Sequence, residues 1–134
     1  MVVNVLFVDG KYRRRGPTAE KVFKTDHRIN PRAAGLSENS KKRLKAADFA
    51  WADIVVCMER KYVPRIKIMF PNIDEFPPLE VINVSDDYIF MAPKLVSLLK
   101  EAMDEVLETY YADRAAAKAD RAAAEASGEA SVEE

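Results

Sequence analysis

Cysteine and histidine each occur only once in the 134 residues. A single cysteine, Cys57, cannot form an internal disulfide, which is consistent with a reducing cytoplasm. Because Cys57 stands in the apolar run "IVVCM", we expect it to be a buried filler. His27 has no cysteine or histidine beside it, so it cannot make a zinc site and we expect it at the surface.

Long apolar runs and a strong net charge are also missing. No stretch reaches the roughly eighteen apolar residues of a membrane span, and the N-terminus lacks the basic and apolar regions of a secretion signal. We therefore expect a cytoplasmic protein of one domain that makes no use of a membrane. The net charge of −1 argues against a generic nucleic-acid binder, but the charge is uneven: residues 113 to 134 carry three basic and six acidic groups, and the rest carries eighteen and sixteen.

Apolar patterning predicts strands that alternate with helices. Residues 2 to 8 are nearly all apolar and mostly β-branched, as in a strand covered on both faces. Pro17 suits the first position of the helix that follows this strand. We expect strands at residues 2 to 8, 32 to 34, 53 to 58 and 80 to 84, and helices at residues 17 to 24, 41 to 50 and 60 to 70. This order predicts an α/β fold of three layers, with a four-stranded parallel sheet between two layers of helices.

The C-terminal third has a different pattern. Apolar residues from 95 to 110 recur at spacings of three and four, which predicts a helix with one packed face. The near-repeats "ADRAAAK" and "ADRAAAE" follow; they favour helix but can bury only alanine, so they either extend the last helix or fray. A coiled coil with a partner is a weaker alternative. The predicted division is an α/β domain at residues 1 to 112 and an alanine-rich helical extension with a disordered acidic tail at residues 113 to 134.

The loop after the first strand has the composition of an anion site. It lies in "VLFVDGKYRRRGPTAE", residues 5 to 20. In an open α/β sheet the ligand crevice lies at the carboxyl ends of the strands, where loop N–H groups and a helix N-terminus come together. Arg15 would add a planar partner for two phosphate oxygens. The predicted ligand is a phosphate-like anion, although an acid, Asp9, stands at the mouth of the loop.

The sequence resembles the low-molecular-weight protein tyrosine phosphatases, in particular their short bacterial-type members, over residues 2 to 99. The blocks that carry the resemblance are "VLFV", an arginine after a five-residue loop, "GPTAE", "AAGLS", "DFAWADIVVCMER" and "SDDYIFMAPKLVSLL". The resemblance implies the flavodoxin-like winding of that family. It also implies a phosphomonoester site that uses no cofactor and no metal.

Three residues match functional positions of the family. Arg15 matches the arginine that binds phosphate, and Asp86 matches the general acid that protonates the leaving phenolate. Tyr88 matches a residue of the pocket wall, although the same acidic run could be only a turn after the fourth strand. The phosphate-binding residues that the resemblance implies are Gly10, Lys11, Tyr12, Arg13, Arg14, Arg15 and Gly16.

Three other positions depart from the family. Asp9 stands where the family has its nucleophilic cysteine. Gly16 stands where the family has a serine that assists the thiolate, and Tyr12 stands where an asparagine commonly braces the loop. The scaffold is therefore recognisable, but the attacking group has been replaced by an acid.

Asp9 admits two hypotheses. A carboxylate can attack phosphorus to form an aspartyl-phosphate, but a charge about 4 Å from a phosphate repels it by roughly 4 kcal/mol per unit charge at an effective dielectric near 20. Enzymes that use this chemistry generally recruit a divalent metal, and only Asp86 is a candidate to share one with Asp9. In the second hypothesis, the Asp9 carboxylate accepts the loop N–H groups, pairs with Arg15 and so fills the loop with an internal anion.

The preferred prediction is a pseudophosphatase, inactive by the cysteine mechanism, with an anion-binding or regulatory role. The alternative is an active phosphomonoesterase with Asp9 as nucleophile, Arg15 as phosphate clamp and Asp86 as general acid. The expected partner is a phosphate-like anion or a phosphorylated or acidic protein, and Arg13 and Arg14 are either a solvated basic rim or a surface for an acidic partner. The acidic tail and the lack of a basic and aromatic stacking pattern count against a nucleic-acid partner.

Overall fold

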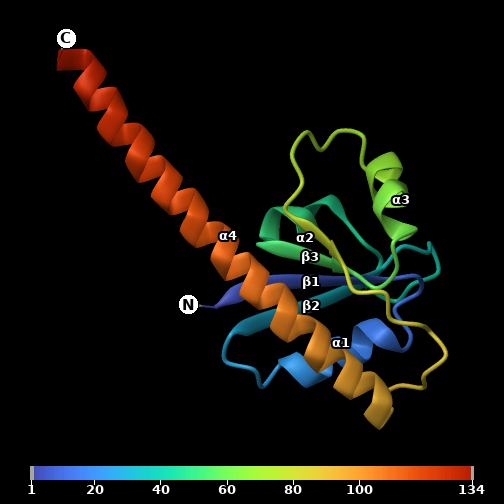
Figure 1. The fold of residues 1–134 in the computed structure, drawn as a ribbon. Helices are drawn as coiled ribbons and strands as arrows, with labels where there is room; N and C mark the ends of the chain where they lie inside the picture. Colours follow the sequence, from blue (N-terminus) through green and yellow to red (C-terminus); the bar gives the residue numbers. More distant parts are fainter. Residues whose placement is uncertain (1, 134) are drawn as a thin grey trace. The chain divides into compact units, whose positions relative to one another are not determined.

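The computed structural model describes residues 2 to 133, and the side chains of residues 2 to 124. Its elements are β1 (Val3–Asp9), α1 (Arg15–Phe23), β2 (Ile29–Gly35), α2 (Ala46–Trp51), β3 (Ile54–Cys57), α3 (Tyr62–Met69), β4 (Leu79–Val81) and α4 (Pro93–Glu133). The four strands form one parallel sheet in the order β2-β1-β3-β4. Helix α1 lies on one face of this sheet, and helices α2 and α3 lie on the other (Figure 1). The predicted α/β class with a four-stranded parallel sheet is confirmed.

The centre of the core is strand β1, which pairs with a strand on each side. Val5, Leu6, Phe7 and Val8 have no more than a trace of exposed surface, as the continuous apolar run predicted for a strand covered on both faces. The ring of Phe7 stacks on that of Phe23 from α1, with 5.5 Å between the centroids. Packing on both faces therefore fixes the carboxyl end of β1, where Asp9 stands.

The predicted helix over residues 41 to 50 is wrong in its first half, since α2 begins only at Ala46. The preceding segment instead runs beside the end of β2. Gly35 donates its N–H to the Lys42 carbonyl at 2.8 Å and accepts the Leu44 N–H at 2.9 Å. These long-range bonds use backbone groups that a helix would need, so the local propensity is overridden.

Strand β2 is longer than the predicted residues 32 to 34, and it contains Pro31. A proline removes one donor from a ladder, which an edge strand such as β2 tolerates. Strand β4 is shorter than the predicted residues 80 to 84, because Asn83 adopts a left-handed φ of 50°. The chain still follows β3 beyond the strand end, where the Val84 N–H donates to the Met58 carbonyl at 2.8 Å.

Pro17 and Pro64 lie in the first turns of their helices. Pro17 is the third residue of α1, because the helix begins at Arg15, two residues before the predicted start. Pro64 is the third residue of α3, because the helix begins at Tyr62, two residues after the predicted start. The N–H groups in the first turn of a helix have no carbonyl to bond within that helix. A proline there therefore costs no helical hydrogen bond, so neither residue breaks its helix.

Helix α4 continues through the alanine-rich repeats. A boundary between two compact units follows Lys100. In the first unit, Leu95 and Leu99 of α4 are fully buried. In the second, the guanidinium of Arg114 donates to the Tyr110 hydroxyl at 3.0 Å. Helix α4 extends to Glu133, through residues for which the sequence predicts a disordered acidic tail. None of the described helices is long and apolar enough to cross a membrane.

Candidate functional site

The loop between β1 and α1 is docked on the residues that follow β2. Leu36 donates its N–H to the Asp9 carbonyl at 3.0 Å, and Ser37 donates to the Gly10 carbonyl at 2.8 Å. Gly35 permits this close approach, because a Cβ atom there would lie only 2.8 Å from the backbone N of Tyr12. The loop is thus held at the carboxyl edge of the sheet, where ligands of open α/β folds bind.

The carboxylate of Asp9 is an internal ligand of this loop. It accepts the Tyr12 N–H at 2.5 Å and the Gly16 N–H at 2.8 Å, one on each oxygen. Only 2% of the residue is exposed. Burial raises the pKa of Asp9, while the N–H donors of Gly16 and Tyr12 and the charge of Arg15 act in the opposite direction. The geometry thus matches one part of the second hypothesis, in which the Asp9 carboxylate accepts the N–H groups of the loop.

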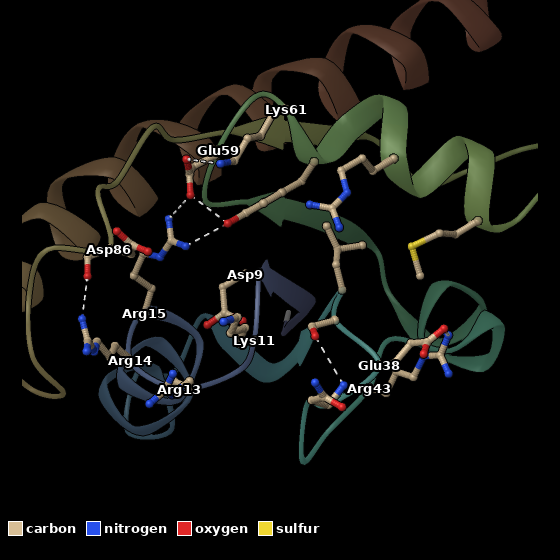
Figure 2. A pocket seen from close by; sticks show the side chains of 17 residues that line it. Asp9, Lys11, Arg13, Arg14, Arg15, Glu38, Arg43, Glu59, Lys61 and Asp86 are labelled. Atoms are coloured by element: carbon tan, nitrogen blue, oxygen red, sulfur yellow. Dashed lines mark hydrogen bonds and ion pairs between the residues drawn. The ribbon is translucent and has the colours of Figure 1, made fainter.

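Arg15 does not pair with Asp9, which is the partner that the sequence led us to expect, but bonds to other groups. Its guanidinium donates to the Glu59 carboxylate at 2.7 Å and to the Tyr62 hydroxyl at 2.9 Å (Figure 2). It also donates to the Val84 carbonyl at 2.7 Å, and the structure gives it no hydrogen bond to Asp9. Three acceptors from outside the loop therefore hold the arginine that was predicted to clamp phosphate.

Glu59 and Tyr62 belong to the candidate site, although the sequence alone did not point to them. The Tyr62 hydroxyl donates to the Glu59 carboxylate at 2.7 Å, which closes a triangle with Arg15. Burial opposes the charge on Glu59, but hydrogen bonds from Tyr62 and Arg15 lower its pKa overall. Burial and the bond to Glu59 raise the pKa of Tyr62 to about 12, so it remains a neutral donor. The only sequence signal was their place just after β3, the strand beside β1.

Tyr12 braces the loop through its side chain. Its backbone φ of 55° is in the left-handed region, which residues other than glycine rarely adopt. The Tyr12 hydroxyl donates to the Glu20 carboxylate of α1 at 2.8 Å. Glu20 also accepts the Ala33 N–H of β2 at 3.0 Å and pairs with Lys42 at 3.1 Å. One carboxylate thus ties the loop, the helix and the edge strand together.

The loop opens on a cavity of about 760 Å³. The predicted site residues among its lining are Asp9, Gly10, Lys11, Arg13, Arg14, Arg15 and Asp86. Tyr12, Gly16 and Tyr88 do not line it. Figure 2 shows Arg14 and Asp86 side by side, where the Arg14 guanidinium donates to the Asp86 backbone carbonyl at 3.1 Å. The structure therefore brings the predicted arginine and general-acid positions to one cavity.

Two further candidates lie away from this chemistry. Cys57 is fully buried, and burial raises its pKa to about 12, so it is an apolar filler as predicted. His27 is exposed, also as predicted. Within the described part of the chain, no group of three or more metal-ligating side chains gathers.

Comparisons with known structures identify the fold. The low-molecular-weight protein tyrosine phosphatase SP-PTP of Streptococcus pyogenes is similar, with a TM-score of 0.64, 16% identity, and coverage of 81% of this chain and 93% of that one. The chain has the fold of the low-molecular-weight protein tyrosine phosphatases. The Drosophila arginine phosphatase DARP is also similar (TM-score 0.59, 16% identity, 79% and 96% coverage), as is the YwlE arginine phosphatase of Geobacillus stearothermophilus (0.56, 19%, 83% and 96%).

No protein-family model matches the sequence, and no curated protein matches it either. The low-molecular-weight phosphatase fold is thus detectable in the structure although overall sequence identity is low. On this fold, Asp9 ends β1, and Arg15 and Gly16 are the first two residues of α1.

Proposed function

We propose that the chain is a pseudophosphatase: a domain with the low-molecular-weight phosphatase fold that does not hydrolyse phosphomonoesters by the cysteine mechanism and that acts by binding an anionic partner. The observation that carries this proposal is the Asp9 carboxylate, bonded to the Tyr12 and Gly16 N–H groups inside the loop. These are donors that a phosphate in the loop would need.

Electrostatics supports the same conclusion. An ionised Asp9 would repel a phosphate about 4 Å away by roughly 4 kcal/mol per unit charge at an effective dielectric near 20. The Arg15 guanidinium, which could offset this repulsion, is engaged by Glu59 at 2.7 Å. Moving Arg15 onto a ligand would leave the Glu59 and Tyr62 oxygens without that donor, which carries its own cost.

A second candidate function is phosphomonoester hydrolysis with Asp9 as nucleophile. The observation in its favour is that Asp9, Arg15 and Asp86 line one cavity. A carboxylate oxygen of Asp9 would form a bond to phosphorus while the leaving oxygen breaks away and takes a proton from Asp86; water would then hydrolyse the aspartyl-phosphate. Both Asp9 oxygens are already hydrogen-bonded within the loop, which counts against an attack by either.

Hydrolysis of an aryl phosphate tests these two functions directly. We expect no turnover by the unmodified protein, with or without Mg²⁺, and turnover by the Asp9→Cys/Gly16→Ser variant. Cys57→Ala in that background is the matched control, because it shows that the new thiol is responsible. Turnover by the unmodified protein that is lost in Asp9→Asn would overturn the pseudophosphatase and establish the carboxylate nucleophile.

A further inference from the structure

The basic side chains of the cavity are not all used by the protein itself. Seven of the lining residues are basic and four are acidic. Arg15 is held by Glu59, and Lys61 lies 3.6 Å from the same carboxylate. Arg43 has only a long contact of 3.9 Å to Glu38. The positive charge left over therefore faces the cavity.

We define the basic rim as four exposed residues that line the cavity: Lys11, Arg13, Arg43 and Arg65. Within the part of the chain that the structure describes, the side chains of Lys11, Arg13 and Arg65 have no ion pair or hydrogen bond. Lys11 and Arg13 come from the loop after β1, Arg43 from the segment beside β2, and Arg65 from α3. The fold thus gathers exposed cations from three separate segments around one opening, and those on the loop after β1 and on α3 are unpaired.

We propose that the basic rim, rather than the interior of the loop, is the binding surface, and that its ligand is an acidic, unphosphorylated peptide segment of a partner protein. This inference rests on the proposed function, since it takes the loop interior to be filled by Asp9. An anion excluded from that interior still meets the rim. Arginine side chains there can bind carboxylates through two parallel hydrogen bonds.

The size of the cavity favours an extended ligand. A volume of about 760 Å³ falls in the range of roughly 300–1,000 Å³ that is typical of pockets for drug-sized ligands. One small anion would contact only part of a rim drawn from three segments. A peptide with several carboxylates can reach Arg13 on the loop and Arg65 on α3 at the same time.

Two features favour a peptide over a nucleic acid. Glu38 and Asp86 are exposed and line the same cavity, and they would repel the closely spaced phosphates of a nucleic-acid strand. Binding of single strands also needs aromatic faces on which bases stack. Among the described residues that line the cavity, Tyr62 alone is aromatic, and it is buried and bonded to Arg15 and Glu59. A peptide can instead space its carboxylates between the acidic side chains of the cavity.

Fluorescence anisotropy with a labelled twelve-residue peptide of alternating glutamate and alanine tests this proposal. The unmodified protein should bind this peptide, should not bind the matching glutamine peptide, and should lose affinity as salt rises. Arg13→Ala and Arg65→Ala should each weaken binding by about threefold, the size expected for an exposed ion pair, and the double variant by more. Lys24→Ala, an exposed lysine at the other end of α1, is the matched control and should leave the affinity unchanged.

The outcomes separate this inference from the proposed function. Absence of peptide binding, equal binding by the rim variants, or tighter binding of a twelve-residue oligothymidylate would each overturn the acidic-peptide surface. Those results would leave the pseudophosphatase standing as long as the aryl phosphate is not hydrolysed. Hydrolysis by the unmodified protein would instead overturn the proposed function, whatever the peptide does.

Discussion

Asp9 and Gly16 fit together sterically as well as through a hydrogen bond. The Gly16 N–H donates to one Asp9 carboxylate oxygen at 2.8 Å. A Cβ atom added at Gly16 would lie 2.8 Å from that same oxygen and 3.2 Å from the carboxyl carbon. The carboxylate thus occupies space that a side chain at position 16 would need. The residues at positions 9 and 16 are therefore structurally coupled.

This relationship predicts that the effect of Gly16→Ser depends on residue 9. In the unmodified protein the substitution should lower the free energy of unfolding by about 1 to 3 kcal/mol, because it overpacks a buried site. In an Asp9→Ala background the cost should shrink by about 0.5 kcal/mol or more, the usual size of coupling between touching residues. Urea unfolding of the four proteins measures the cycle. Additive costs would contradict the steric coupling. The Gly16→Ala variant separates the effect of the added Cβ atom on stability from that of the serine hydroxyl.

Asp9→Asn should strengthen the binding of sulfate. Removing one negative charge about 4 Å from the anion relieves repulsion of a few kcal/mol, so we expect binding to tighten by at least about tenfold at pH 7. Because the pKa of Asp9 is raised by burial, sulfate affinity of the unmodified protein should also rise as pH falls from neutral through that pKa. The Asp9→Asn variant should lack this rise. Calorimetric titration measures both trends.

Asp74→Asn is the matched control for the sulfate experiment. Asp74 is exposed and does not line this cavity, so the substitution removes the same charge elsewhere on the surface. Sulfate is preferred to phosphate because it does not change its charge in this pH range. Equal sulfate binding by the unmodified protein and Asp9→Asn at pH 7 would remove the idea that Asp9 fills the loop.

Glu59→Gln should destabilise the protein at neutral pH and cease to matter in acid. Its carboxylate holds the buried Arg15, and we expect a loss of about 1 to 2 kcal/mol at pH 7, allowing for the partial exposure of Glu59. The pKa of Glu59 is lowered in the folded state, so its contribution is present above the ordinary value of 4.5 and disappears as pH falls through the lowered pKa. Urea unfolding at pH 7 and pH 3 tests this sign.

Glu38→Gln is the matched control, because Glu38 is 83% exposed and lies 3.9 Å from Arg43. We expect almost no change in the free energy of unfolding from this substitution. If Glu59→Gln costs no more than Glu38→Gln at pH 7, the Arg15 ion pair is not a significant contributor to stability.

The position of the candidate site was inferred from local sequence. A buried strand, a polar loop and a helix start are adjacent in the chain, and the carboxyl end of a central strand is where open α/β folds bind ligands. The acceptor role of Asp9 follows from the same short segment, since its donors are three and seven residues away. Three-dimensional information was not needed for either conclusion.

The partners of Arg15 could not be predicted, because they are 44, 47 and 69 residues away in the sequence. Their contact depends on the pairing of β1 with β3, which places the residues after Cys57 beside those after Val8. The boundary of α2 failed for a related reason: the segment before Ala46 is held by Gly35. In both cases a long-range contact outweighed the local pattern.

Cys57 should be inert in the folded protein, whereas a cysteine at position 9 should react. Burial raises the pKa of Cys57 to about 12, so at pH 8 almost no thiolate is present and a reagent has no access to it. Iodoacetamide should leave the native protein unlabelled and label it once in urea. In Asp9→Cys, the Tyr12 and Gly16 N–H groups and nearby Arg15 would stabilise a thiolate that faces the cavity, so one rapid labelling event is expected. Asp9→Cys/Cys57→Ala should retain that event, and its loss would show that Cys57, not the loop, is the reactive position.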